Sequence, residues 1–125
     1  MEIRFECSCD GFTCDDIAKY NFIRLFAPSE DLSLLKDPDE QIIEKKEIFL
    51  VYKYPLKNSV KIQHTSENGF ERSKLIREIS NNYHKFYRET PENINRNGYK
   101  TELEYLVLTG LNPIDDNTYE VNVDA

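Results

Sequence analysis

Residues 71–89 read ERSKLIREISNNYHKFYRE, and this stretch decides the fold of the 125-residue chain. Its apolar side chains recur at helical spacing, as Leu75, Ile76, Ile79, Tyr83, Phe86 and Tyr87. At about 100° per residue they fill an arc of about 120°, which is typical of a helix that buries one face. The sequence therefore predicts a core-facing amphipathic helix over about 71–89.

The flanks of this stretch favour the same boundaries. Phe70 can pack on Leu75 as a hydrophobic staple. Thr90-Pro91 ends the helix, because a residue before proline avoids the α region. Glu71 stands at the cap position, where Ser, Thr or Asp is favoured, so we expect a weak N-terminal cap.

Two β-hairpins are predicted, one on each side of the helix. Residues 48–54 are apolar, aromatic and β-branched, and Val60, Ile62 and His64 alternate with polar residues after the short loop 55–58. Residues 103–111 are almost continuously apolar and fit a helix or a strand. The turn-rich residues 112–117 and the alternating residues 119–124 favour a strand, and hence a terminal hairpin.

The N-terminal third is harder to interpret. Ile3, Phe5, Cys7 and Cys9 alternate with polar residues and predict a half-buried strand. Residues 13–26 fit neither period cleanly, and we expect a helix there; residues 28–47 are expected to connect. The expected fold is α+β in a single domain of residues 1–125: an antiparallel sheet of about five strands with one long amphipathic helix (about 71–89) packed on it.

Composition excludes several classes of protein. The chain has no run of about 18 apolar residues and no basic, apolar start, so neither a membrane span nor secretion is expected. The net charge of −7 repels nucleic acid and anionic lipid at long range. Three cysteines cannot all pair within one chain, which favours a reducing compartment and a cytoplasmic protein.

Four segments resemble an uncharacterised family found in large double-stranded DNA viruses of amoebae and in some plants and algae. They are YPL at 54–56, NGFERSKL at 68–75, LVLTGL at 106–111 and VNVDA at 121–125, and the match spans residues 48–125. The family has Phe-Thr-Arg where this chain has Phe70-Glu71-Arg72. The resemblance implies a strand pair, a helix and a second strand pair, and a viral protein of the virion or virus factory. It brings no catalytic residues.

The run of Cys7, Cys9 and Cys14 is the sharpest chemical candidate, because thiolates bind zinc. A tetrahedral site needs a fourth ligand, which His64 could supply, and zinc sites usually show two residues between paired cysteines rather than one. The strand alternation instead places Cys7 and Cys9 on the apolar face, where thiols act as small apolar side chains. We favour structural thiols and expect no cofactor or metal.

Nothing in the sequence indicates catalysis. His64 and His84 have no neighbouring nucleophile, and none of the common catalytic or nucleotide-binding spacings occurs. General acid–base catalysis needs a positioned partner, so both histidines are interpreted as structural. The chain is therefore expected not to be an enzyme, with no catalytic or cofactor-binding residues.

The most unusual feature is electrostatic. On the predicted helix, four cations lie within an arc of about 80° opposite the apolar stripe; they form the basic ridge, which consists of Lys74, Arg77, Lys85 and Arg88. Residues 101–125 carry six carboxylates and no Lys or Arg. A solvated helix face explains the ridge most simply. The functional interpretation is docking on an acidic partner, such as the terminal hairpin of a second copy, which would give an isologous dimer.

We therefore expect a non-enzymatic structural or protein-interaction protein that forms a homodimer. The alternative is a nucleic-acid or nucleoprotein accessory that binds through the basic ridge, although the net charge of −7 makes nucleic acid the less favoured partner.

Overall fold

The computed structural model describes residues 2–5, 7–8, 19–20, 22–97 and 100–125. Its elements follow in the order β1 (Ile3–Arg4), β2 (Cys7–Ser8), β3 (Lys19–Tyr20), β4 (Ile23–Arg24), α1 (Ser29–Ser33), β5 (Gln41–Ile43), β6 (Glu47–Tyr52), β7 (Val60–Thr65), β8 (Phe70–Glu71), α2 (Arg72–Glu89), the 3-10 turns η1 (Pro91–Asn93) and η2 (Leu103–Tyr105), β9 (Val107–Pro113) and β10 (Thr118–Asp124). The expected α+β fold with one long helix is confirmed.

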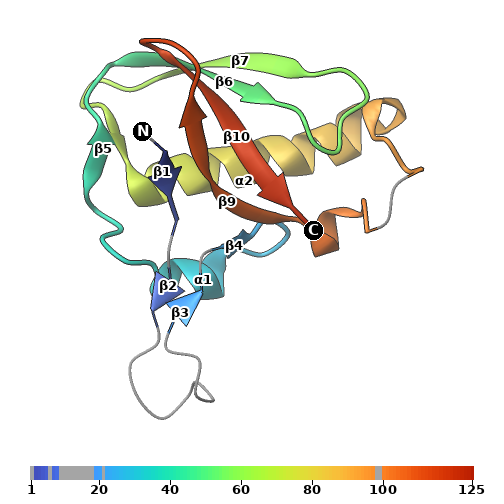
Figure 1. Ribbon diagram of the computed structural model, residues 1–125, viewed down its shortest axis with the longest axis horizontal. Helices are drawn as coiled ribbons and strands as arrows, with labels where there is room; N and C mark the ends of the chain where they lie inside the picture. The colour runs from blue at the N-terminus through green and yellow to red at the C-terminus, as the bar shows by residue number, and fades with distance from the viewer. Residues whose placement is uncertain (1, 6, 9–18, 21, 98–99) are drawn as a thin grey trace.

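The main sheet has the strand order β1-β9-β10-β6-β7, and β4 also pairs with β9 (Figure 1). Both predicted hairpins are present, because β6 pairs with β7 and β9 with β10, each antiparallel. The sheet is mixed rather than wholly antiparallel, because β10 and β6 run parallel, with Thr118 opposite Phe49. Two smaller pairs, β2 with β3 and β5 with β8, lie outside it.

Helix α2 covers one face of this sheet and forms the core with it (Figure 1). The buried side chains of α2 include Leu75, Ile76, Ile79, Tyr83 and Phe86, as the helical spacing predicted. Residues of even number in β6 point toward the helix: Ile48, Leu50 and Tyr52 are fully buried. The Tyr52 ring meets the rings of Tyr83 and Phe86 edge-on, with centroids 5.5 and 5.2 Å apart, a favourable aromatic geometry.

The start of α2 is held by backbone rather than by a side-chain cap. Glu71 is the N-cap and makes no capping hydrogen bond, as the sequence suggested. The free N–H groups of Arg72 and Ser73 instead donate to the carbonyl oxygens of Glu40 and Pro38, at 3.0 and 2.9 Å. The segment before β5 therefore satisfies amide groups that every helix start leaves unpaired.

The prediction of a helix over residues 13–26 is wrong for the described residues of that range. Lys19–Tyr20 and Ile23–Arg24 are short strands, and residues 13–18 lie outside the described ranges. Ile23 and Leu25 are fully buried while Arg24 and Phe26 are exposed, which is a period of two. Pairing of β4 with β9 overrides a local pattern that fitted neither period. The connecting segment 28–47 contains α1 and β5.

Candidate interaction surface

The four basic-ridge residues predicted from the sequence all lie on α2, and three of them are exposed. Arg77, Lys85 and Arg88 project from the helix surface that is not packed on the sheet. Lys74 is half-buried instead: its Nζ donates to Ser66 Oγ at 2.8 Å and lies 5.6 Å from the centroid of the Phe70 ring. The part of the ridge that a partner can reach is therefore Arg77, Lys85 and Arg88.

Carboxylates on α2 neutralise little of this exposed ridge. Lys85 Nζ lies 3.9 Å from Glu89 Oε2, and both side chains are at least half exposed, so the pair contributes only a few tenths of a kcal/mol, about 0.3–0.5. Glu78 turns toward His64. In the described part of the chain, no carboxylate lies within ion-pair distance of Arg77 or Arg88.

Charge is distributed unevenly along the chain, and the positively charged segment contains β6, β7 and α2. Residues 45–90, which contain β6, β7 and α2, carry ten Lys and Arg against five Glu, a net charge of +5. All other residues carry six cations and eighteen carboxylates, a net charge of −12. The segment that contains β6, β7 and α2 thus carries net positive charge in a chain that is acidic as a whole.

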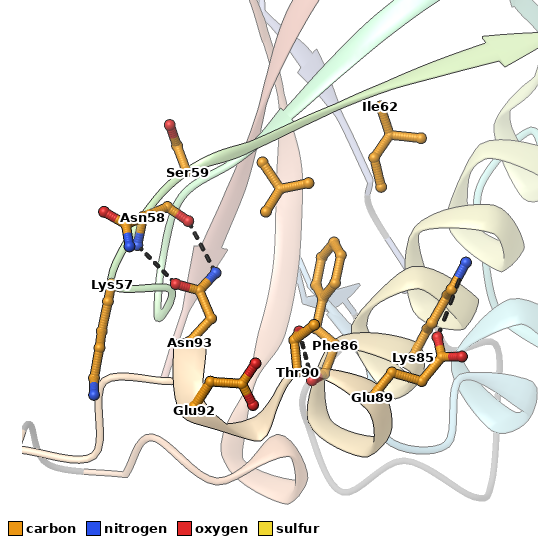
Figure 2. A pocket seen from close by; sticks show the side chains of 11 residues that line it. Lys57, Asn58, Ser59, Ile62, Lys85, Phe86, Glu89, Thr90, Glu92 and Asn93 are labelled. Atoms are coloured by element: carbon orange, nitrogen blue, oxygen red, sulfur yellow. Dashed lines mark hydrogen bonds and ion pairs between the residues drawn. The ribbon is translucent and has the colours of Figure 1, made fainter.

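A groove lies between β7 and the C-terminal half of α2 (Figure 2). Its volume is about 610 Å³, within the range of about 300–1,000 Å³ that ligand pockets occupy. Val60 and Ile62 of β7 and Phe86 of α2 supply the apolar lining. Charged side chains stand around it: Lys57, Lys85, Glu89 and Glu92.

One end of the groove is closed by a reciprocal amide pair. Asn58 N donates to Asn93 Oδ1, and Asn93 Nδ2 donates to the Asn58 carbonyl oxygen, both at 3.0 Å (Figure 2). Thr90 Oγ1 donates to the Phe86 carbonyl oxygen at 3.1 Å at the end of α2. The two Asn58–Asn93 bonds join the β6–β7 loop to η1 at this end of the groove.

The outer edge of β7 is the open edge of the sheet. Phe49 N donates to the Asn117 carbonyl oxygen at 2.8 Å, toward β10, so its partner Gln63 is in a non-hydrogen-bonded pair of the β6–β7 ladder. The backbone N–H and C=O of Gln63, and by alternation those of Lys61 and Thr65, therefore point away from β6. Within the described ranges, no other segment hydrogen-bonds to these groups.

Beyond the groove, His64 belongs to a buried polar cluster between β6, β7 and α2. Its Nε2 lies 3.3 Å from Tyr52 Oη, and Asn82 Nδ2 donates to the same phenol oxygen at 2.8 Å. Its Nδ1 lies 3.3 Å from Glu78 Oε2, a buried oxygen that accepts no well-aligned hydrogen bond. Burial raises the pKa of the Tyr52 phenol well above its usual range.

This arrangement resembles an acid–base relay but does not face solvent. Tyr52 is fully buried and His64 is 8% exposed, so neither the phenol nor the imidazole is presented to a substrate. His84 contacts the Phe26 carbonyl oxygen through Nε2 at 2.9 Å. Both histidines thus have partners within the chain, and their interpretation as structural residues stays a prediction.

Two of the three cysteines considered as zinc ligands lie outside the described residues. Cys7 lies in β2, while Cys9 and Cys14 fall outside the described ranges. In the part of the chain that the structure describes, no group of three or more His, Cys, Asp or Glu side chains is placed to hold a metal ion. The prediction of structural thiols stays a prediction.

The acidic C-terminal region does not form one continuous surface. Glu102 pairs with Arg96, Glu120 Oε1 lies 3.5 Å from Lys53 Nζ, and Asp115 accepts a hydrogen bond from Asn117 N within the β9–β10 turn. That hydrogen bond contributes most to the lowered pKa of Asp115. Asp115 and Asp116 at the hairpin tip are exposed, as are Glu104 and Asp124 elsewhere in the region.

The sequence missed the groove, although it identified residues that line it. The alternation places Val60 and Ile62 on one face of a strand, and the helical spacing places Phe86 on the core face of the helix. The sequence alone does not indicate that β7 lies at the edge of the sheet. The half-buried state of Val60 and Ile62, beside the fully buried Leu50 and Tyr52 opposite them, is the structural sign of that position.

No family model matches this chain, and comparisons with curated proteins and with solved structures found no similar protein. Among the helices of the described ranges, none combines the length and apolar character that crossing a bilayer requires.

Proposed function

We propose that this chain is a non-enzymatic protein-interaction protein that binds acidic partners through the side formed by β7 and α2. The observation that carries the proposal is the charge division: residues 45–90 have a net charge of +5 within a chain of −7. A segment of concentrated positive charge attracts acidic surfaces and repels basic ones, which favours encounter with one class of partner.

A homodimer is part of this proposal. A second copy can supply its acidic hairpin tip, Asp115 and Asp116, to the exposed ridge cations. Size-exclusion chromatography with light scattering tests this directly, and we expect a dimer that dissociates as salt is raised, because surface charges are screened. A strict monomer at high concentration and low salt would remove the dimer and leave the acidic-partner proposal standing.

Nucleic acid is the second candidate, and the row of exposed cations on α2 is the observation that favours it. Three ridge cations can neutralise only a few phosphates, and the net charge of −7 opposes the approach of a polyanion. An acidic protein segment has lower charge density than a duplex, so it can meet the positive segment while avoiding the acidic remainder.

Both candidates are tested by fluorescence anisotropy with a dye-labelled oligoglutamate and a dye-labelled DNA duplex at low salt. The test variant reverses three exposed ridge cations: Arg77→Glu, Lys85→Glu and Arg88→Glu. The control variant makes the same change in net charge outside residues 45–90: Arg4→Glu, Lys36→Glu and Lys100→Glu. We expect oligoglutamate binding that the ridge variant loses and the control variant keeps.

Other results would decide against the proposal. Equal loss in the two variants would show that net charge alone drives binding, and no binding of oligoglutamate would remove the acidic partner. Tighter binding of the duplex, with a steep salt dependence that the ridge variant abolishes, would establish the nucleic-acid function instead.

The resemblance over residues 48–125 is the ground for proposing that the protein works as a viral component, in the virion or the virus factory. Mass spectrometry of purified particles and antibody staining of infected amoebae test this. Absence from both locations would contradict a viral role without bearing on the interaction surface.

A further inference from the structure

We propose that β7 and the adjoining groove form a binding site for an extended acidic segment, which pairs with β7 as an added strand and places alternate apolar side chains in the groove. This inference rests on the proposed function, because it specifies how an acidic partner is held. It assigns the specificity of the site to backbone pairing and side-chain alternation rather than to charge alone.

The edge of β7 supplies the backbone part of the site. The N–H and C=O groups of Lys61, Gln63 and Thr65 point outward, and in the described part of the chain no segment occupies them. An extended segment that pairs there satisfies these groups and its own, which is the general basis of strand addition. β7 has six residues, long enough for several such hydrogen bonds.

The groove supplies the side-chain part of the site. Successive side chains of a strand point to opposite faces of a sheet, so every second side chain of the added strand lies on the α2 side. There it meets Val60, Ile62 and Phe86 in a groove of about 610 Å³. Those alternate positions are therefore expected to be apolar and branched.

The remaining side chains of the added strand lie on the open face of the sheet. Lys61 stands on this face, with its Nζ 4.8 Å from the centroid of the Phe49 ring. Carboxylates opposite it make favourable cross-strand pairs. The site is thus matched to a segment in which acidic and apolar residues alternate.

Charges of both signs stand at each end of β7, so neither end adds a preference for further carboxylates. At the Val60 end the groove is bordered by Glu89 and Glu92 as well as Lys57 and Lys85. At the Thr65 end Lys46 and Lys74 are accompanied by Glu47 and Glu67. The cation that favours an acidic segment is therefore Lys61, on the open face of β7.

Other occupants fit the observations less well. A second copy that paired its own β7 with this edge would bring two regions of net charge +5 together, and like charges across an interface are repulsive. A helical segment could fill the groove but would leave the outward groups of Lys61, Gln63 and Thr65 unpaired. The extended acidic segment is the occupant that satisfies both the edge and the charge.

The experiment uses the full chain and a dye-labelled peptide in which Glu and Val alternate, about nine residues long so that it extends beyond β7. A peptide of the same composition with Glu and Val in two separate blocks is the matched control. We expect the alternating peptide to bind about tenfold more tightly than the block peptide. The block peptide cannot pair along β7 without turning carboxylates into the groove, and loss of one buried apolar side chain alone can approach that factor.

N-methylation of the peptide then tests the backbone pairing. A strand added at an edge uses every second N–H of the peptide. Methylation at one set of alternate residues should therefore abolish binding, and methylation at the other set should leave it within about twofold. Equal effects at all positions would overturn strand addition.

Two measurements on the protein complete the test. In hydrogen exchange followed by NMR, the amides of Lys61, Gln63 and Thr65 should exchange fast in the free chain and become protected when the peptide binds. The substitution Gln63→Pro removes an outward N–H while keeping the β6–β7 ladder, so it should weaken the alternating peptide about tenfold. Gln63→Ala, which keeps that N–H, should not.

The outcomes separate this inference from the proposed function. If the block peptide binds as well as the alternating one and the Arg77, Lys85 and Arg88 reversal abolishes both, acidic binding stands and strand addition is wrong. If the amides of Lys61, Gln63 and Thr65 are already protected in the free chain in proportion to its concentration, a second copy occupies the edge. If oligoglutamate does not bind, the proposed acidic-partner function is wrong.

Discussion

Replacing Asp31 by alanine tests whether a buried carboxylate holds the N-terminal segment to the domain. Asp31 is fully buried at α1, and it accepts hydrogen bonds from Arg24 N at 2.8 Å, Arg24 Nε at 3.0 Å and Arg24 Nη2 at 2.9 Å. These bonds connect α1 to β4, whose Ile23 belongs to the core.

The loss of stability in Asp31→Ala depends on whether each hydrogen-bond donor of Arg24 has another acceptor after the substitution. The Arg24 side chain is half exposed and keeps a 3.2 Å contact with Glu30, so its charge returns to water at little cost. The backbone N–H of Arg24 loses its acceptor, which costs about 1–3 kcal/mol, and loss of the charge-assisted bonds adds about 1.5–3 kcal/mol. We expect the free energy of unfolding to fall by about 3 kcal/mol, a large part of the total of about 5–15 kcal/mol.

Urea unfolding followed by circular dichroism measures this change. Asp31→Asn keeps acceptor oxygen at the site and should lose about half as much, about 1–2 kcal/mol. Glu30→Ala is the control, because Glu30 makes only an exposed contact with Arg24 and should change stability by less than about 0.5 kcal/mol. A value for Asp31→Ala no larger than that of the control would refute the proposed role of the buried pair.

Three further substitutions or titrations test the packing that positions the site. Gly110→Ala should cost about 1–3 kcal/mol in urea unfolding, because a Cβ there would lie 2.2 Å from the Ile3 carbonyl oxygen; the exposed neighbour Asn112→Ala should be near neutral. A double-mutant cycle of Tyr52→Phe and Asn82→Ala should give a coupling energy of about 1 kcal/mol, since the 2.8 Å bond joins them, and an energy near zero would show that the buried cluster is not coupled. Burial raises the pKa of Tyr87 from 10.0 to about 12. The folded state therefore holds this proton more tightly than the unfolded state, so the stabilisation is complete below pH 10 and is lost as pH rises toward 12. The difference in phenolate absorbance between the unchanged chain and Tyr87→Phe should rise near pH 12, and a rise near pH 10 in the folded protein would contradict the shift.

Local periodicity predicted the elements whose partners are adjacent in sequence. α2 appears where its apolar spacing placed it, and β6–β7 and β9–β10 are hairpins joined by short turns. The N-terminal strands were predicted only in part. The alternation from Ile3 indicated a strand, which the structure has as the short β1 and β2, whereas β3 and β4 lie where a helix was expected. β1 and β4 are two residues each and both pair with β9, near the other end of the chain. Two residues carry too little pattern to indicate such a partner.

The same distinction applies to the candidate site. Helical spacing identified the basic ridge, but it could not separate Lys74 from the three exposed cations, because the acceptor Ser66 lies outside the helix. The groove was not predicted, because it depends on the order of strands in the sheet. That order includes the parallel β10–β6 pair, and a parallel pair requires a crossover whose course no local pattern reports.

The two edges of the sheet are protected in different ways, and the difference bears on what β7 can bind. The outer edge of β9 is covered by β1 and β4 from the same chain. Among the described residues nothing pairs with the outer edge of β7, which carries Lys61 in a segment, residues 45–90, of net charge +5. Charge on an exposed edge discourages pairing with another copy of the same edge. The same charge attracts a strand of opposite sign, so the charge that discourages pairing of β7 with the β7 of another copy also selects the partner. The proposed homodimer uses the hairpin tip and the basic ridge instead, so the edge stays available to an acidic segment in the monomer and in the dimer.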